Sequence, residues 1–236
     1  MEERKPSVRI QTSILHGVEH KALVWLARRM PAWVTSDMLT FTGFAGALII
    51  AAGYALTTKD IRWLWLACFG FAVNWFGDSL DGTLARVRGT QRPVYGFFVD
   101  HNVDCINETI MFIGVGMSVL MNLTIALIAL VAYLLMSIYV YINAHLKDEF
   151  RISYAGLGPT EFRIVIVIVN ILFIFIAPLR EAAWDVALPG GGTVTLRVLD
   201  FIALAISAIL YLIYLVSIFK DAKYYAGIDP PRDFKG

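Results

Sequence analysis

The chain has 236 residues, of which 58% are hydrophobic and only 17% are charged. A soluble domain carries about 25% charged residues and few long apolar runs, so the composition excludes an ordinary soluble globular protein. The formal net charge of +1 identifies no partner by itself, and we expect no nucleic acid to bind. The remaining class is a polytopic membrane protein.

The first element in chain order is a segment with helical periodicity at residues 12–30. Its apolar face consists of Leu15, Val18, Ala22, Trp25 and Leu26. We predict a basic amphipathic helix that lies flat in the headgroup layer of a membrane. The alternative is a helix packed on the cytoplasmic ends of the bundle. Residues 1–38 would form an N-terminal cytoplasmic segment that contains this helix.

Six apolar runs follow, each long enough or nearly long enough for the about 20 residues that a bilayer crossing requires. They lie at residues 39–57, 63–84, 96–120, 123–145, 161–178 and 199–219. We therefore predict an all-α integral membrane protein: a bundle of six transmembrane helices over residues 39–219, preceded by the interfacial helix. Residues 220–236 are predicted to be a polar cytoplasmic tail. The Pro-Gly-Gly-Gly sequence within 179–198 indicates a turn between the last two crossings.

The distribution of positive charge predicts the orientation. With six crossings, both termini and the connections at 85–95 and 146–160 lie on one side. Counting Arg163, that side carries sixteen of the twenty Lys and Arg residues, and the other four are Lys59, Arg62, Arg180 and Arg197. The positive-inside rule then places both termini and the aspartates described next on the cytoplasmic side.

Four aspartates lie at the ends of the second and third predicted crossings: Asp78, Asp81, Asp100 and Asp104. Residues three or four positions apart share a face of a helix, so each pair projects from one face of its own helix. The sequence between the pairs contains Gly89 and Pro93, which indicates a short turn that brings the two faces together. We therefore predict that all four carboxylates converge on one small volume.

Carboxylates packed together repel one another and favour protonation unless a positive charge is present. Sites made of oxygen ligands favour hard divalent cations over zinc or copper. Four carboxylates suit a pair of ions, which lie about 3.5–4 Å apart in two-metal phosphoryl-transfer sites. We predict two divalent cations, Mg²⁺ or Mn²⁺, as cofactors.

Small residues and an arginine accompany the aspartates. Gly82, Ala85 and Gly96 lie on the same faces, where a larger side chain would fill the space beside the metals. Arg86 follows directly, and a guanidinium is a natural partner for a phosphate group. Metals, small residues and an arginine together indicate a pocket for a diphosphate.

The segment 78–104 resembles the signature of the CDP-alcohol phosphotransferases, D-x2-D-G-x2-A-R-x8-G-x3-D-x3-D. The matching residues are Asp78, Asp81, Gly82, Ala85, Arg86, Gly96, Asp100 and Asp104. Nine residues instead of eight separate the arginine from the next glycine, and the turn can absorb the extra one. The segment from Thr35 to Thr40 is similar to the family's Thr-Pro-Asn-x-x-Thr. The run Asp-His-Asn-Val-Asp at 100–104 is similar to the Asp-His-x-x-Asp of its choline and ethanolamine branch.

The resemblance implies a membrane enzyme that transfers a substituted phosphate from a CDP-linked donor to a hydroxyl group and releases CMP. It implies metal ligation by Asp78, Asp81, Asp100 and Asp104, with Asp104 also the catalytic base on the acceptor hydroxyl. It further implies that the CDP moiety is bordered by Gly82, Ala85, Arg86, Gly96, Asp37 and Thr40. It also suggests a homodimer.

The sequence does not identify the acceptor alcohol. Candidate acceptor-binding residues are Glu108, Lys147, Arg151 and Arg163, of which the last three are equally explained as ordinary cytoplasmic positive charges. The favoured donor is CDP-diacylglycerol with a small polar acceptor, and the alternative is a CDP-choline or CDP-ethanolamine donor with diacylglycerol. An intramembrane prenyltransferase and a non-enzymatic cation transporter are the rival functions. The apolar sequence after Glu108 argues against a transport path, and the short spacing of the aspartates argues against a prenyltransferase.

Overall fold

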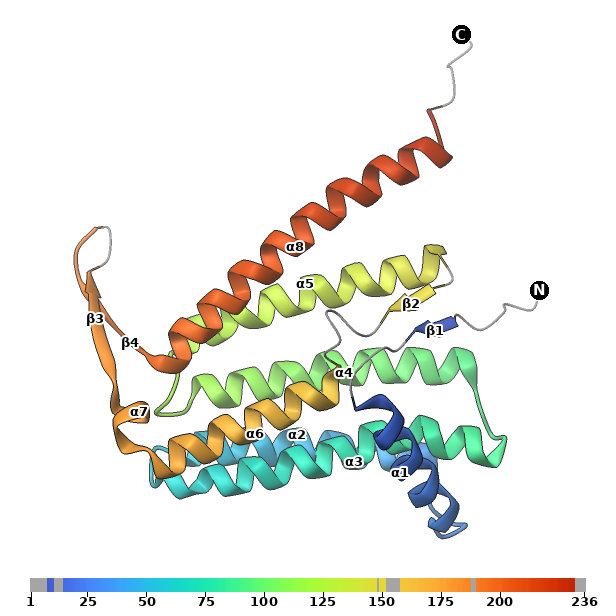
Figure 1. Ribbon diagram of the computed structural model, residues 1–236, viewed down its shortest axis with the longest axis horizontal. Coiled ribbons are helices and arrows are strands. Elements are labelled where there is room, and N and C mark those ends of the chain that lie inside the picture. The colour runs from blue at the N-terminus through green and yellow to red at the C-terminus, as the bar shows by residue number, and fades with distance from the viewer. Residues whose placement is uncertain (1–7, 11–14, 148, 152–157, 188–189, 232–236) are drawn as a thin grey trace.

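The computed structural model describes residues 8–10, 15–147, 149–151, 158–187 and 190–231, and the structural statements below refer to these residues. For residues 8–10, 147 and 149–151 only the backbone is described. The chain is mainly helical (Figure 1). The predicted all-α class is therefore confirmed.

The long helices coincide with the six predicted apolar runs. They are α2 (Ser36–Leu56), α3 (Leu64–Arg88), α4 (Pro93–Gly116), α5 (Leu123–Lys147), α6 (Pro159–Phe175) and α8 (Val198–Ile228). In the described part of the chain, α2, α5 and α8 are long and apolar enough to cross a membrane. Helix α6 has only 17 residues, and α3 and α4 carry the aspartates. The count of six crossings thus stays a prediction.

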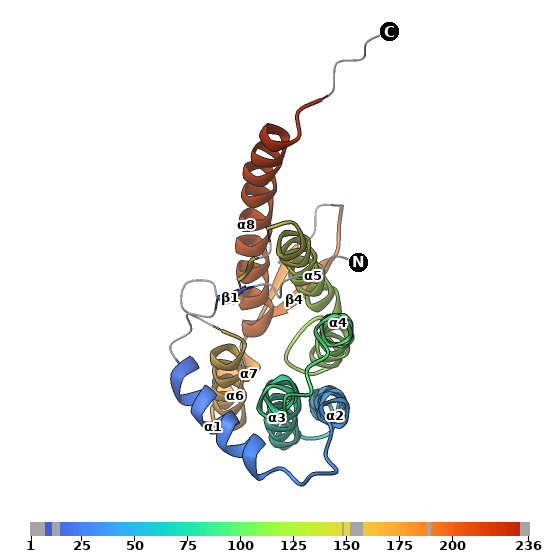
Figure 2. The same cartoon turned by 90° about the vertical axis from the view of Figure 1, so that its right-hand side faces the viewer.

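The helices are arranged in a curved row. Neighbouring pairs along the row are α3 with α2, α2 with α4, α4 with α5, and α5 with α8 (Figure 2). Helix α6 lies beside α3 at the other end of the row. The row therefore has α6 at one end and α8 at the other.

Helix α1 (His16–Arg29) crosses beneath α3 and α6 (Figures 1 and 2). The carboxylate of Glu19 accepts hydrogen bonds from Trp75 Nε1 of α3 at 2.8 Å and from Thr160 Oγ1 of α6 at 2.5 Å. Its opposite face leaves Val18 and Trp25 exposed. Helix α1 thus packs on the end of the bundle, and its place in the headgroup layer stays a prediction.

Glycines bring α2 and α3 into close contact. A β-carbon at Gly46 would lie 2.4 Å from the backbone nitrogen of Asn74, and one at Gly77 would lie 2.2 Å from that of Gly43. The buried Asn74 side chain donates a hydrogen bond to the Gly43 carbonyl at 2.9 Å. Backbone packed on backbone leaves little freedom for sliding, so the end of α3 that carries Asp78 is fixed on α2.

We expect Gly77→Ala to destabilise the protein by about 1–3 kcal/mol, because the added methyl group must push α3 away from α2. The matched control is Gly17→Ala in α1, where an added β-carbon meets nothing within 4 Å. Thermal unfolding of the two purified variants in detergent measures the difference. Equal unfolding temperatures would show that the α2–α3 contact is looser than described.

Two short sheets complete the fold. Strand β1 (Val8–Ile10) pairs in parallel with β2 (Glu149–Arg151). Strands β3 (Ala183–Ala187) and β4 (Thr193–Arg197) form an antiparallel hairpin after the five-residue helix α7 (Ala177–Glu181), and the 3₁₀ turn η1 (Ile61–Trp63) precedes α3. The predicted turn falls here, at three glycines that all have positive φ: Gly190, Gly191 and Gly192. The strands themselves were not predicted, because each has only three to five residues.

The last helix extends beyond the predicted crossing. Helix α8 continues to Ile228, whereas the tail was predicted to begin at residue 220. Two hydrogen bonds to α5 accompany the extension: Tyr139 donates to Asp221 at 2.5 Å, and Tyr225 donates to Asn143 at 2.9 Å. Polar contacts between neighbouring helices thus extend α8 past its apolar sequence.

Candidate active site

A cavity of about 1600 Å³ lies within the row of helices. Towards the hairpin end its lining is apolar: Phe112, Met121, Ala129, Leu199, Ile202 and Ala203. At the opposite end it is polar. Every predicted site residue whose side chain is described lines this cavity: Asp37, Thr40, Asp78, Asp81, Gly82, Ala85, Arg86, Gly96, Asp100, Asp104, Glu108 and Arg163.

Three of the four aspartates meet at the polar end. Oxygen atoms of Asp78 from α3 and of Asp100 and Asp104 from α4 all lie within 4.8 Å of one another. The latter two are four residues apart and therefore share one face of α4. The predicted convergence of the two helix ends is thus found for these three side chains.

The turn between α3 and α4 produces this convergence. Helix α3 ends at Gly89, whose φ of 66° is the left-handed conformation that glycine adopts without strain. Pro93 occupies the first turn of α4, where its missing N–H costs nothing. The guanidinium of Arg88 donates to the backbone carbonyls of the α1–α2 connection, namely those of Met30, Pro31 and Val34. The nine-residue spacing is therefore accommodated within the end of α3, the turn and the start of α4.

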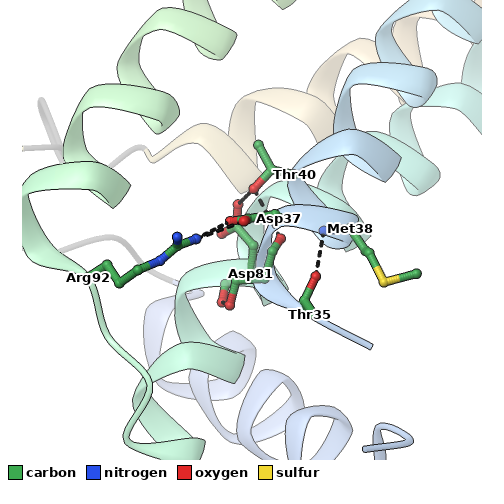
Figure 3. A network of polar contacts seen from close by, with 7 residues as sticks. Thr35, Asp37, Met38, Thr40, Asp81 and Arg92 are labelled. Carbon is green, nitrogen blue, oxygen red and sulfur yellow. Dashed lines mark hydrogen bonds and ion pairs between the residues drawn. The ribbon is translucent and has the colours of Figure 1, made fainter. Parts of the chain in front are cut away.

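The fourth aspartate, Asp81, lies outside the group of three carboxylates. Its carboxylate accepts a hydrogen bond from Thr40 Oγ1 at 2.7 Å and another from the backbone of Gly82 (Figure 3). Its backbone carbonyl accepts from Ser36 Oγ at 2.9 Å. Asp81 is thus directed towards the first turns of α2.

Arg163 of α6, the helix beside α3, contacts the carboxylate group. Its Nη2 donates to Asp78 Oδ2 at 2.6 Å, and both side chains are largely buried. This pairing could not be read from the sequence, where Arg163 was a candidate for acceptor binding or an ordinary cytoplasmic charge. The other two basic candidates, Lys147 and Arg151, end α5 and β2, and their side chains lie outside the described residues.

Glu108 lies deeper in the cavity, one turn beyond Asp104 on α4. Its carboxylate is hydrogen-bonded to Tyr133 of α5, and its Oε2 atom is buried without a partner in the part of the chain that the structure describes. Tyr133, Ser137 and Tyr141 of α5 all line the cavity. These residues were missed, although polar side chains at i, i+4 and i+8 of an otherwise apolar helix are a recognisable pattern.

Arg92 and Asp37 connect the starts of α4 and α2. Arg92 Nη2 donates to both carboxylate oxygens of Asp37, at 2.8 and 2.7 Å (Figure 3). Its guanidinium also stacks 3.9 Å from the centre of the Tyr95 ring. The hydrogen bonds to Asp37 raise the pKa of the Arg92 guanidinium. Arg92 was not among the predicted site residues, because its partner is 55 positions away in the sequence.

The residues at the polar end suit a divalent cation. Carboxylate oxygens are the preferred ligands of Mg²⁺ and Mn²⁺, and three carboxylates this close together need more positive charge than Arg163 alone supplies. The chain thus combines membrane-length helices, a cluster of acidic oxygens and a cavity that is polar at one end and apolar at the other. This combination is typical of membrane-bound enzymes that act on amphipathic substrates.

Comparison with known proteins identifies the family. The model of the CDP-alcohol phosphatidyltransferase family matches residues 33–219, which is more than half of the chain. The chain belongs to this family. The resemblance noted in the motif from Asp78 to Asp104 is therefore confirmed.

Individual relatives differ in the activities that their names state. The chain is 30% identical to an archaetidylinositol phosphate synthase of Methanothermobacter thermautotrophicus over 137 residues, which is 58% of this chain and 66% of that protein. It is 34% identical to a phosphatidylinositol phosphate synthase of Cutibacterium acnes over 36% of this chain and 39% of that protein. It is 22% identical to cholinephosphotransferase 1 of Bos taurus over 70% of this chain and 41% of that protein. The chain thus spans less than two thirds of the length of each of these curated relatives.

Proposed function

We propose that this protein transfers a phosphatidyl group from CDP-diacylglycerol to the hydroxyl group of a small polar alcohol and releases CMP. The observation that carries the proposal is the group of three carboxylates at the polar end of a cavity whose other end is apolar. In the reaction, the acceptor oxygen forms a bond to the β-phosphorus, and the bond from that phosphorus to the oxygen of CMP breaks. The acceptor's proton passes to a base on the protein.

Asp104 is the proposed base. Asp104 belongs to the group of three carboxylates, lines the cavity, and is one turn of α4 away from both Asp100 and Glu108. A carboxylate within hydrogen-bond distance of the acceptor hydroxyl can take its proton as the new bond forms. Asp78, Asp81, Asp100 and Asp104 are the proposed ligands of two divalent cations. When bound, such cations neutralise the charge of the diphosphate and of the departing CMP.

The first turns of α2 and the facing ends of α3 and α4 are the proposed binding region for CDP. Gly82 and Gly96 leave space there: a β-carbon at Gly96 would meet nothing within 4 Å, and one at Gly82 would lie 3.3 Å from Arg86 Nη1. Ala85 and Thr40 line the same part of the cavity. A guanidinium beside small residues suits a diphosphate, which is bulky and highly charged.

The apolar part of the cavity favours a lipid on the donor. Its lining comes from α4, α5, α6 and α8, so acyl chains would lie between the two ends of the helical row. Acyl chains are stabilised by apolar surroundings, whereas CDP requires a polar site. The polar residues near Glu108 and Tyr133, together with Arg163, are the proposed contacts of the acceptor. Transfer from CDP-choline or CDP-ethanolamine to diacylglycerol is the second candidate, which the similarity to cholinephosphotransferase 1 favours.

We also propose that the six long helices cross the membrane. Six crossings would place both termini and the polar end of the cavity in the cytoplasm, where the donor is made available. Three membrane-length helices and the parallel course of α3, α4 and α6 beside them support this arrangement (Figure 1). The exposed Trp25 and the adjacent Arg29 on α1 suit a headgroup layer. A homodimer is proposed from the family resemblance.

The proposed function is tested by CMP release from purified protein in detergent. We expect CDP-diacylglycerol with one member of a panel of polar alcohols to release CMP and to yield the corresponding phospholipid. A parallel reaction contains CDP-choline and diacylglycerol. Chelation with EDTA should stop CMP release, and added Mg²⁺ or Mn²⁺ should restore it, because the carboxylate site requires a divalent cation. Undiminished CMP release after thorough chelation would contradict the proposal.

A further inference from the structure

The ion pair between Arg92 and Asp37 lies at the polar end of the cavity, and Arg92 matches none of the fixed motif positions. Both side chains line the cavity and are about half exposed, at 56% and 53%. A single nitrogen of the guanidinium, Nη2, makes both contacts to the carboxylate. An arginine carries five N–H donors, so this contact uses only part of its capacity.

The ion pair is next to the proposed donor-binding region. Asp37 and Thr40 are one turn apart on α2, and Thr40 donates to the Asp81 carboxylate at 2.7 Å (Figure 3). Arg92 therefore holds a positive charge close to a proposed metal ligand, on the side of the cavity where the diphosphate of a CDP-linked donor is expected. A guanidinium in that place suits a phosphate group of the donor.

In the ion pair between Arg92 and Asp37, a phosphate group can replace Asp37 as the partner of the guanidinium. Exposed ion pairs contribute little to stability, because water solvates both partners when they separate. A phosphate oxygen forms strong, charge-assisted hydrogen bonds with a guanidinium. Hydrogen bonds from Arg88 hold the end of α3, whereas Arg92 lies three residues beyond Gly89, the residue that ends this helix. The side chain can therefore move without disturbing the end of α3.

We propose that Arg92 is a further donor-binding residue, whose guanidinium turns from Asp37 to a phosphate of the CDP-linked donor when the donor binds. This inference rests on the proposed function and names a contact that the motif does not contain. Once released, the Asp37 carboxylate accepts hydrogen bonds from the nucleoside, either from the cytosine amino group or from the ribose hydroxyls. An acidic side chain is a natural acceptor for the cytosine amino group. Arg92 thus binds a phosphate of the donor, and Asp37 binds its nucleoside.

The test compares the binding of CDP and of cytidine to the full chain in detergent with Mg²⁺, by calorimetry for CDP and by competition for cytidine. We expect Arg92→Ala to raise the Kd for CDP roughly 10-fold, because a charge-assisted hydrogen bond is lost. The Kd for cytidine should stay within about twofold of the wild-type value, because cytidine has no phosphate. Asp37→Ala should instead weaken CDP and cytidine by the same factor, because it removes the acceptor for the nucleoside from both ligands.

The matched control is Arg62→Ala. Arg62 forms an exposed pair with Asp60 at 2.7 Å, next to η1 at the other end of the bundle. Hydrogen bonds from Arg62 lower the pKa of the Asp60 carboxyl to about 2, so this pair is fully formed at neutral pH. The control should leave both affinities unchanged. If the Arg92→Ala protein aggregates, Arg92→Gln takes its place in the comparison. Glutamine removes the charge and keeps a long polar side chain.

CDP binding by the wild type tests the proposed function, and CDP binding by the Arg92 variant tests the role of Arg92. An unchanged Kd for CDP in the Arg92 variant, or equal losses for CDP and cytidine, would overturn the role of Arg92. If wild-type protein binds no CDP in the presence of Mg²⁺, the proposed function itself fails. A wild type that binds CDP and releases CMP, with an Arg92 variant that behaves identically, removes only the inference.

Discussion

Replacing Asp104 with asparagine is expected to lower the rate of CMP release by about 100- to 10,000-fold, the range that general acid–base catalysis contributes. Asparagine has nearly the same shape as aspartate but cannot accept the acceptor's proton. Asp78 and Asp100 remain in place in this variant, so most of the oxygen ligands for a divalent cation are kept. We therefore expect Mn²⁺ and CDP to bind with affinities close to those of the wild type.

Two measurements check this expectation. CMP release gives the turnover rate, and calorimetry gives the affinities for Mn²⁺ and for CDP. Asp60→Asn is the control for the loss of one carboxylate elsewhere, because Asp60 pairs only with its neighbour Arg62 in the contacts described. Turnover close to that of the wild type would remove Asp104 from the role of base. A loss of Mn²⁺ binding as large as the loss of turnover would show that Asp104 acts as a metal ligand only and not also as the base.

Asp78→Asn is expected to weaken divalent cation binding and also to lower the stability of the protein. The carboxylate belongs to the group of three and is at the same time the partner of Arg163 at 2.6 Å. Removing one partner of a fully buried ion pair costs roughly 3–5 kcal/mol, because the other charge stays desolvated. Both side chains here keep some exposure, so we expect a loss of about 1–3 kcal/mol in the free energy of unfolding.

A second substitution separates the two effects. In the double variant Asp78→Asn with Arg163→Gln, no unpaired guanidinium is left, and the unfolding temperature should return towards that of the wild type. Mn²⁺ binding should not return, because the missing oxygen ligand is not replaced. Recovery of Mn²⁺ binding in the double variant would show that Asp78 serves only to hold Arg163.

The sequence was sufficient to predict the long helices, since each long apolar run became a helix within a few residues of its predicted bounds, except at the end of α8. The two failures have different causes. Strands β3 and β4 have five residues each, which is too short a stretch for the periodicity to distinguish a strand from a loop. The last turns of α8 are polar in sequence, and contacts from Tyr139 and Asn143 of a neighbouring helix accompany them. Such contacts depend on which helices are neighbours, and no pattern within one segment records that.

The candidate site shows the same difference between features within one segment and contacts between segments. The spacing of Asp100 and Asp104, and the turn after Arg88, sufficed to predict that acidic side chains of α3 and α4 would meet. The partners from distant segments could not be predicted. Thr40 with Asp81, Arg163 with Asp78 and Tyr133 with Glu108 each join two different helices, at residues 25 or more positions apart in the sequence. These partners give the carboxylates different surroundings, which the motif alone does not indicate.

The glycine contact between α2 and α3 restricts which positions can vary without moving the helices. At Gly46 and Gly77 a backbone atom lies within 2.4 Å of the place where a β-carbon would be, so any larger side chain there must push the two helices apart. The cavity is also lined by residues of α5, α6 and α8, which take no part in this contact. Substitutions there can reshape the cavity while α2 and α3 stay in place.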